Sequence, residues 1–317
     1  MGIDCLSAGI LVADHLCPPI ARMPRAGELV LCDELPLAIG GCASNVAMDL
    51  AHLGVDVGVI GCVGSDPFGK FIVDTLCDSG VETSGIRKVS GTGTSATLII
   101  NVEGEDRRFI HTIGANAALK ATDLPIEKVR QAKVLYVGGY LLLSGTDQEE
   151  LRKVFREARS LGVRTVLDVV LPGEGDHWSK LERVLSETDV FLPNVDEAAA
   201  ITGLDDPIQQ AEKLRSAGAD TVVITCGDAR TILLSDQCRL KASVYSVPYV
   251  GATGAGDAFD AGYIAGLLEA GDARKCLEWG SALGASCVRA IGATESVFDR
   301  TEVEAFLRDE RLTIETF

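Results

Sequence analysis

The chain has 317 residues, of which 47% are hydrophobic and 24% charged, so it can bury a sizeable core in one large α/β domain or two ordinary ones and is not expected to be disordered. Its formal net charge of −17 argues against a nucleic-acid partner, because binding a phosphate backbone needs clustered Lys and Arg. A small anionic ligand stays compatible with this charge, since backbone amides can bind it.

Cysteine usage and the amino terminus bear on location. The ten cysteines include no CxxC pair and there are only four histidines, which argues against a zinc site and suits a reducing cytoplasm. The first residues lack a basic segment, and no run of 18 apolar residues exists. We therefore expect neither a signal peptide nor a membrane span.

The first half of the chain predicts two kinds of strand. Residues 5–13 (CLSAGILVA) are typical of a buried strand. Residues 28–39 alternate apolar and polar side chains, which predicts a strand with one exposed face, and residues 94–111 predict a hairpin that turns at Glu103–Asp106. The two alternating segments predict one small antiparallel sheet beside the main body.

The rest of the chain alternates short apolar strands with helices such as 145–162. The strand candidates are residues 55–63, 133–139, 163–170, 188–194 and 220–226. Their near-continuous Val, Ile and Leu content indicates strands covered on both faces, hence a mainly parallel sheet flanked by helices. Ligands of such sheets bind at the carboxyl ends of the strands.

The segment GATGAGDAFDAG (251–262) is the strongest candidate site. Gly254, Ala255 and Gly256 leave the backbone amides open to an anion, and a helix that begins near Asp257 adds the positive end of its dipole. This suits a phosphoryl group in transit, with Asp257 as the general base. A glycine-rich turn with Asp257 as a helix cap explains the same residues equally well.

Two nucleotide motifs are rejected. The dinucleotide fingerprint GxGxxG fails because Phe259 stands where its third glycine belongs, which argues against an oxidoreductase. Residues 64–70 (GSDPFGK) spell GxxxxGK, but Phe71 replaces the Ser or Thr that a P-loop needs for its metal.

Two weaker motifs each have two interpretations. Gly40, Gly41 and Asn45 suit the binding of a polyol, whereas Ser44 or Asn45 could instead cap a helix. In PNVDE, Asn194 and Glu197 suit Mg²⁺ reached through waters, but taken singly they are more typical of a capping box.

Taken together, the order of these motifs resembles the ribokinase-like sugar kinases of the PfkB family over essentially the whole chain. The resemblance rests on Asp14 after the first strand, then GGCASN, GCVGSDPFG, GANAAL, PNVDE, VVITCGD, TGAGDAF and a late GAT. It implies one kinase domain over 1–317. The Rossmann-type core would comprise about 1–13, 40–92 and 114–317, and the β lid about 14–39 and 93–113.

The resemblance also implies roles for individual residues. Asp257 would be the catalytic base, beside an anion hole of Gly254, Ala255 and Gly256. The phosphoryl acceptor would be held by Asp14, Gly40, Gly41 and Asn45, and Mg²⁺ by Glu197 and Asn194 through waters. ATP would be bound by Asn194, Thr225, Gly227, Thr253, Gly254, Gly256 and Ser281.

The sequence departs from the family where Gly251 and Ala252 replace the usual Asp-Thr, which puts activation by a monovalent cation in doubt. We expect an ATP-dependent, Mg²⁺-requiring kinase of a small sugar. The alternatives are a nucleoside kinase, made less favoured by the aromatic content of 5%, and a catalytically inactive sugar-binding relative. An exposed lid face is compatible with a homodimer.

Overall fold

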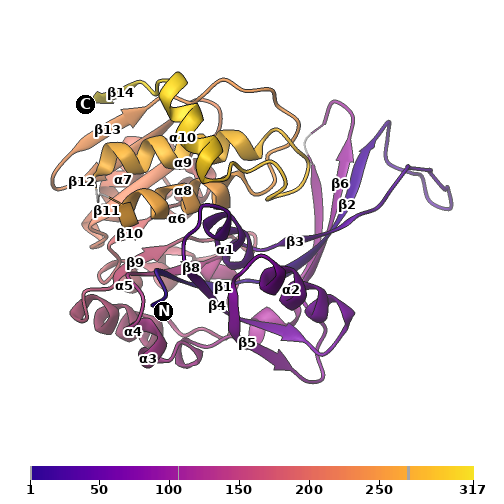
Figure 1. The fold of residues 1–317 in the computed structure, drawn as a ribbon, viewed down its shortest axis with the longest axis horizontal. Helices are drawn as coiled ribbons and strands as arrows, with labels where there is room; N and C mark the ends of the chain where they lie inside the picture. Colours follow the sequence, from indigo (N-terminus) through magenta and orange to yellow (C-terminus); the bar gives the residue numbers. More distant parts are fainter. Residues whose placement is uncertain (1, 106, 270–271) are drawn as a thin grey trace.

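A ten-stranded sheet forms the centre of the described structure (Figure 1). The computed structural model describes residues 2–105, 107–269 and 272–317. The strand order is β14-β13-β12-β11-β10-β9-β8-β1-β4-β5. In this order, every neighbouring pair from β11 to β5 is parallel, and every neighbouring pair from β14 to β11 is antiparallel. The bounds are β1 (Cys5–Gly9), β4 (Val57–Gly64), β5 (Glu82–Val89), β8 (Val134–Gly138), β9 (Arg164–Leu167), β10 (Val190–Phe191), β11 (Thr221–Cys226), β12 (Arg230–Ser235), β13 (Arg239–Ala242) and β14 (Ile314–Thr316).

Helices cover both faces of this sheet, which explains why every residue of β1, β4 and β8 is buried. One face packs against α1 (Cys42–His52), α2 (Pro67–Asp78), α8 (Ala255–Glu269), α9 (Ala273–Cys287) and α10 (Arg300–Asp309). The other packs against α3 (Ile126–Val129), α4 (Gln148–Ser160), α5 (Trp178–Leu185), α6 (Val195–Thr202) and α7 (Pro207–Ser216). Short 3₁₀ turns are η1 (Gly114–Ala118), η2 (Ala121–Asp123) and η3 (Tyr140–Leu142). The mainly parallel core predicted from the sequence is confirmed.

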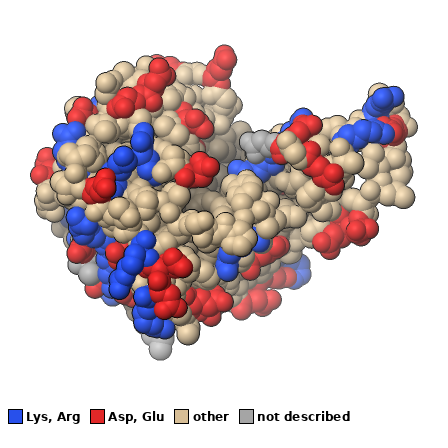
Figure 2. Space-filling view, turned by 90° about the horizontal axis from the view of Figure 1, so that it is seen from above, with Lys and Arg blue, Asp and Glu red and all other residues tan. Residues whose placement is uncertain are grey.

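A second, four-stranded sheet projects from the body as an arm (Figure 1). We call it the small sheet; its strands are β2 (Val12–Ile20), β3 (Leu37–Gly40), β6 (Ala96–Val102) and β7 (Arg108–Thr112), in the order β3-β2-β6-β7. Its two outer pairs are antiparallel, as predicted, whereas the central pair of β2 and β6 is parallel. The molecular surface is hollowed where the arm leaves the body (Figure 2).

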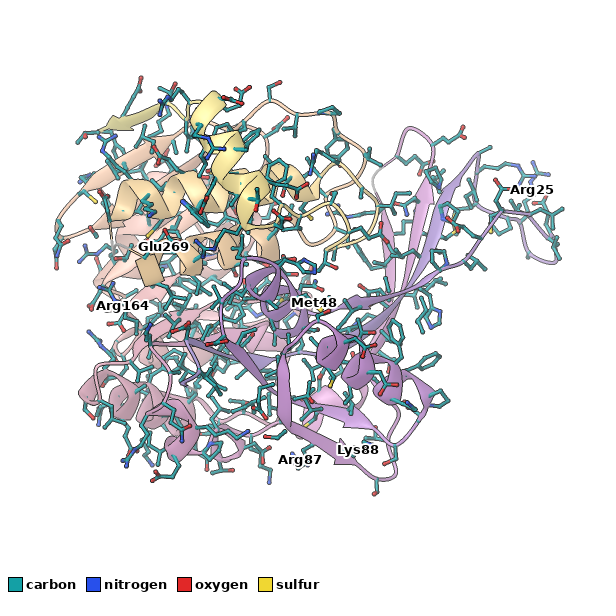
Figure 3. All side chains as sticks on the ribbon, in the orientation of Figure 1. Arg25, Met48, Arg87, Lys88, Arg164 and Glu269 are labelled. Carbon is teal, nitrogen blue, oxygen red and sulfur yellow. The ribbon has the colours of Figure 1, made fainter. Side chains whose placement is uncertain are left out.

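The strand predicted over 28–39 is wrong for most of its length. Only residues 37–40 form a strand, because β2 offers them a partner only from Val12 to His15. Leu29 and Leu31 are 77% and 84% exposed in the connecting loop, since no second layer covers them. Figure 3 shows Arg25, in this loop, at the far end of the arm.

Other differences concern strand limits. The predicted strand 5–13 is two strands, because the chain leaves the large sheet after Gly9 and enters the small sheet at Val12. The predicted hairpin at 94–111 is confirmed by β6 and β7; Asp106 in its turn lies outside the described residues. Within the described part of the chain, no helix is both long and apolar enough to cross a bilayer.

Candidate active site

The GATGAGD segment forms the approach to α8. Asp257 lies in the first turn of this helix and is partly buried, and Gly254 has a φ of 79°. A Cβ on Gly254 would lie 2.5 Å from the Cβ of Ala293, so only glycine fits there. The amides of Gly254, Gly256 and Asp257 donate to no described residue, as expected for the start of a helix. The turn therefore presents free N–H groups beside a carboxylate.

Asn45 holds Asp257 from the opposite helix. It lies in the first turn of α1, which packs against α8, and its Nδ2 donates to Asp257 Oδ2 over 2.7 Å. Removal from water raises the pKa of Asp257, while the hydrogen bonds from Asn45 and Cys42 oppose this rise. Neither Ser44 nor Asn45 caps α1, because its N-cap is Gly41 with a φ of 90°; the capping interpretation of this motif is wrong.

Asp14 and Gly40 lie against each other, close to Asp257. Asp14 lies in β2 opposite Ala38 of β3, and a side chain on Gly40 would collide with the Asp14 carboxyl. The pKa of Asp14 is raised to about 6. Burial is the main cause, a hydrogen bond from Thr97 opposes it, and the charge of Asp257 adds to it. The predicted acceptor residues Asp14, Gly40, Gly41 and Asn45 thus lie together around Asp257.

Two residues that the sequence analysis missed complete this cluster. The Cys42 Sγ and one oxygen each of Asp168 and Asp257 lie within 4.8 Å of one another. Asp168 follows β9, and its Oδ2 accepts the Gly139 amide over 2.9 Å. Burial, followed by the charge of Asp257, raises the pKa of Asp168 to about 7. The predicted strand 163–170 included Asp168, whereas β9 ends at Leu167; an acidic residue within that apolar run was the signal that would have found it.

Further acidic groups surround the cluster. Glu197 and Asp260 both have pKa values raised well above the usual range, first by burial and then by the charge of Asp168. Tyr136 donates to Asp260 over 3.0 Å. Because these carboxyls disfavour one another's charged forms, a divalent cation bound nearby would stabilise them. The electrostatics of the site therefore fit a metal ion.

Asn194 and Glu197 form the capping box of α6. The Asn194 side chain accepts from the Glu197 amide over 2.9 Å, and the Glu197 carboxylate accepts from the Asn194 amide over 3.0 Å. Only Oε2 of Glu197 is used in this way, which leaves Oε1 for a water or an ion. The two residues are oxygen donors of the type that Mg²⁺ prefers, so they fit the predicted role without excluding the capping one.

The remaining predicted nucleotide residues lie on β11, in the turn after it, on α9 and in the segment before α8. Thr225 pairs with Asn194 in an isolated parallel bridge, and Gly227, with a φ of 57°, turns the chain from β11 into β12. Ser281 lies on α9, and its buried Oγ has no partner in the described structure. Thr253 accepts the Cys287 thiol through its carbonyl over 3.2 Å.

The sequence from residue 5 to residue 300 matches the model of the pfkB family carbohydrate kinases. The chain belongs to this family. This PfkB kinase is 27% identical to the ribokinase of Haemophilus influenzae over 305 residues, which cover 94% of this chain and 96% of that enzyme. It is 28% identical to the aminoimidazole riboside kinase of Salmonella typhimurium over 286 residues, which cover 86% of this chain and 89% of that enzyme.

Its fold is that of the ribokinases. The structure of a putative ribokinase II from E. coli in complex with ATP and Mg²⁺ matches with a TM-score of 0.82 at 21% identity, over 97% of this chain and 100% of that one. The expected ribokinase-like fold, with its parallel core and small sheet, is therefore confirmed.

Residues 64–70, which we rejected as a P-loop, have a structural role in this PfkB kinase. Asp66 caps α2, and its carboxylate accepts from the amides of Gly69 and Thr94 and from the Thr94 hydroxyl. A carboxylate of the protein thus occupies the helix start where a P-loop would bind phosphate.

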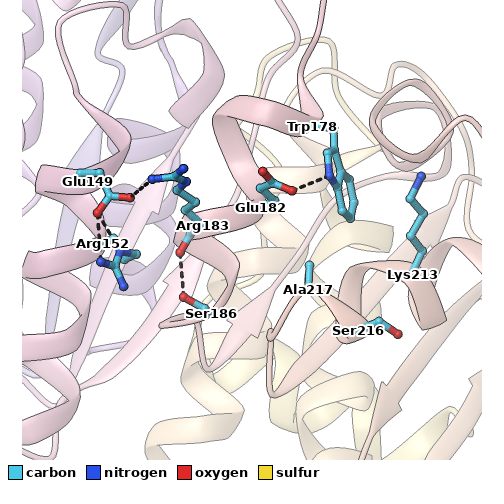
Figure 4. A pocket seen from close by; sticks show the side chains of 9 residues that line it. All are labelled: Glu149, Arg152, Trp178, Glu182, Arg183, Ser186, Lys213, Ser216 and Ala217. Atoms are coloured by element: carbon cyan, nitrogen blue, oxygen red, sulfur yellow. Dashed lines mark hydrogen bonds and ion pairs between the residues drawn. The ribbon is translucent and has the colours of Figure 1, made fainter.

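A surface groove of about 640 Å³ lies elsewhere, on α4, α5, α7 and the residues that follow them (Figure 4). Trp178 and Lys213 line it with the Lys213 Nζ 4.7 Å from the ring centroid, and Arg183 reaches Glu149 over 3.1 Å. None of the residues predicted for the kinase site lines this groove. The candidate active site is instead the cluster around Asp257, where Asp14 of the small sheet lies close to Asn45 of α1.

Proposed function

We propose that this PfkB kinase transfers the γ-phosphoryl group of ATP to a hydroxyl of a small sugar. The observation that carries the proposal is the partly exposed Asp257 carboxylate, held by Asn45 and placed next to amides that have no acceptor among the described residues. Only a carboxylate that combines a reachable oxygen with a neighbouring anion site can deprotonate an alcohol while charge passes to a phosphate.

In this mechanism Asp257 accepts the proton of the acceptor hydroxyl, whose oxygen then attacks in line. The amides of Gly254 and Gly256 hold the negative charge that develops on the transferred group, whereas the Ala255 amide, expected to share this role, donates to the Ala252 carbonyl over 3.2 Å. Asp14 and Asn45 position the acceptor. Gly40 leaves room for Asp14, and Gly41 lets the chain pass close to Ile10 and Val12. The small sheet, taken from about 14–39 and 93–113, would close over the acceptor and exclude water.

ATP would be bound by Asn194, Thr225, Gly227, Thr253, Gly254, Gly256 and Ser281. Mg²⁺, when bound near Glu197 and Asn194, would neutralise phosphate charge. The ATP and Mg²⁺ in the E. coli structure named above and the mutually repelling carboxyls of this chain support both assignments. The backbone at Gly251 and Ala252 carries no carboxylate, so a monovalent cation is not part of the proposal.

A nucleoside kinase is the second candidate, supported by the likeness to an aminoimidazole riboside kinase. A panel of sugars and nucleosides, read by ADP release, distinguishes the two. Release of ADP with sugars supports the proposal, and release with nucleosides alone contradicts it.

The decisive variant is Asp257→Asn. We expect at least a 1,000-fold loss of turnover, on the order of what a missing base and its charge together contribute, with ATP affinity retained. Tight sugar binding by the wild type without turnover would instead identify an inactive relative.

We also propose a homodimer that pairs the exposed faces of two small sheets. Phe109 and Ile110 of β7 are 53% and 65% exposed, and the leucines of the loop 21–36 on the same arm are also uncovered. Light scattering of the wild type and of Ile110→Lys tests this pairing. All ten cysteines are free in the structure, which supports a reducing cytoplasm as the location.

A further inference from the structure

Three potential metal ligands from distant parts of the chain lie together next to Asn45. Cys42 begins α1, Asp168 follows β9 and Asp257 lies in the first turn of α8, and their ligand atoms lie within 4.8 Å of one another. Such a site has no sequence signature, because its residues are more than 80 positions apart. The argument from CxxC spacing against a zinc site therefore does not apply to it.

The three side chains of this cluster are largely buried. Cys42 and Asp168 are 6% and 8% exposed, and Asp257 is the one partly exposed member of the three. Next to them, Asn45 is 3% exposed and donates to Asp257, while its Oδ1 is buried and has no partner in the described structure. A desolvated oxygen beside two carboxylates and a thiol is an environment that a cation stabilises.

We propose that Cys42, Asp168 and Asp257 form a binding site for a thiophilic divalent cation such as Zn²⁺. Tetrahedral zinc places sulfur and oxygen ligands about 3.5 Å apart, so the three groups have to close by about 1 Å. The partly exposed Asp257 in the first turn of α8 can make this movement. The thiol releases its proton to solvent as the S–Zn bond forms, and a water fills the fourth position.

The sulfur ligand makes the site selective. Mg²⁺ prefers six oxygens and keeps its waters, whereas Zn²⁺ and Co²⁺ bind thiolate strongly. The bound ion would engage the Asp257 oxygen that otherwise accepts the substrate proton, so the site would be inhibitory. This consequence, though not the binding itself, rests on the proposed role of Asp257.

The binding is tested with Co²⁺ as the probe, added to the reduced full-length protein. We expect a thiolate-to-cobalt charge-transfer absorption at one equivalent, lost in Cys42→Ala and kept in Cys77→Ser, which removes an exposed free thiol. Asp168→Asn keeps the thiol and should weaken Co²⁺ binding at least tenfold. Absence of the band in the wild type, or its persistence in Cys42→Ala, would overturn the site.

The inhibition is tested separately, by ADP release with excess Mg²⁺ and one equivalent of Zn²⁺. We expect turnover of the wild type to fall at least tenfold and to recover with a chelator. In Cys42→Ala the ratio of rates with and without Zn²⁺ should stay near one. An unchanged wild-type rate overturns the inhibitory role. Absence of turnover in zinc-free controls, with Mg²⁺ and every acceptor tested, would contradict the proposed function and leave the cobalt result intact.

Discussion

Asn45 donates a hydrogen bond from Nδ2 to Oδ2 of Asp257 over 2.7 Å, although the two residues are 212 positions apart. Each lies in the first turn of its helix, so the packing of α1 against α8 sets the contact. The bond favours the charged form of Asp257 and opposes the effect of burial. It limits the rise of the Asp257 pKa and orients the carboxylate.

Replacing Asn45 with Ala should reduce kcat/KM by about 10- to 100-fold, because Asp257 loses both its orientation and a charge-stabilising donor. The acidic limb of the pH–rate profile should move to higher pH, since the pKa of Asp257 then rises further. Asn101→Ala is the matched control, as Asn101 donates only to the carbonyl of Cys17 in the small sheet. An unmoved acidic limb in Asn45→Ala would show that the contact does not tune the base.

Gly254→Ala should destabilise the protein by about 2–4 kcal/mol, because a left-handed φ and a collision with Ala293 add together. Gly256→Ala is the control for stability, as a Cβ there meets nothing within 4 Å. Thermal melts of the two variants should separate them clearly. Equal melting temperatures would mean that the turn relaxes around an added methyl group.

Asp49 is fully buried in α1, and neither carboxyl oxygen has a partner in the described structure. Burial, followed by the charge of Asp257, raises its pKa well above the usual value. The folded protein therefore binds this proton more tightly than the unfolded chain, so the contribution is present at low pH and is lost as pH rises through the folded pKa.

Asp49→Asn removes the ionisable group with little change of shape. We expect its melting temperature to match the wild type below about pH 4 and to exceed it by a margin that grows until the pH passes the raised pKa of Asp49. A constant difference across this range would indicate a packing effect instead of a titration.

Asp14, with a pKa of about 6, should control acceptor binding in the acidic range. At one pH unit below this value only about a tenth of Asp14 is ionised, so KM for the acceptor should rise several-fold between pH 7 and pH 5. In Asp14→Asn the acceptor KM should be high and insensitive to pH over this range. The KM for ATP serves as the internal control. Protonation of Asp14 should not change it in the wild type, and the substitution should not change it in Asp14→Asn.

The core was predictable because its strands are buried on both faces and carry unbroken apolar runs, as in Thr221–Cys226. The turn before α8 was predictable because three small residues precede Asp257 in sequence. The loop at 28–36 was not predictable, because an alternating pattern indicates a strand with one exposed face only where a partner strand is available. Cys42 and Asp168 were missed because only the tertiary fold brings them to Asp257.

The parallel pairing of β2 with β6 joins Ala13–Ile20 to Ala96–Val102 across about 80 intervening residues. During synthesis, the arm cannot assemble until the ribosome has released the chain beyond residue 102. Until then the nascent β2 segment stays without its central neighbour, so slow translation of residues 21–95 would lengthen the interval in which chaperones have to shield it.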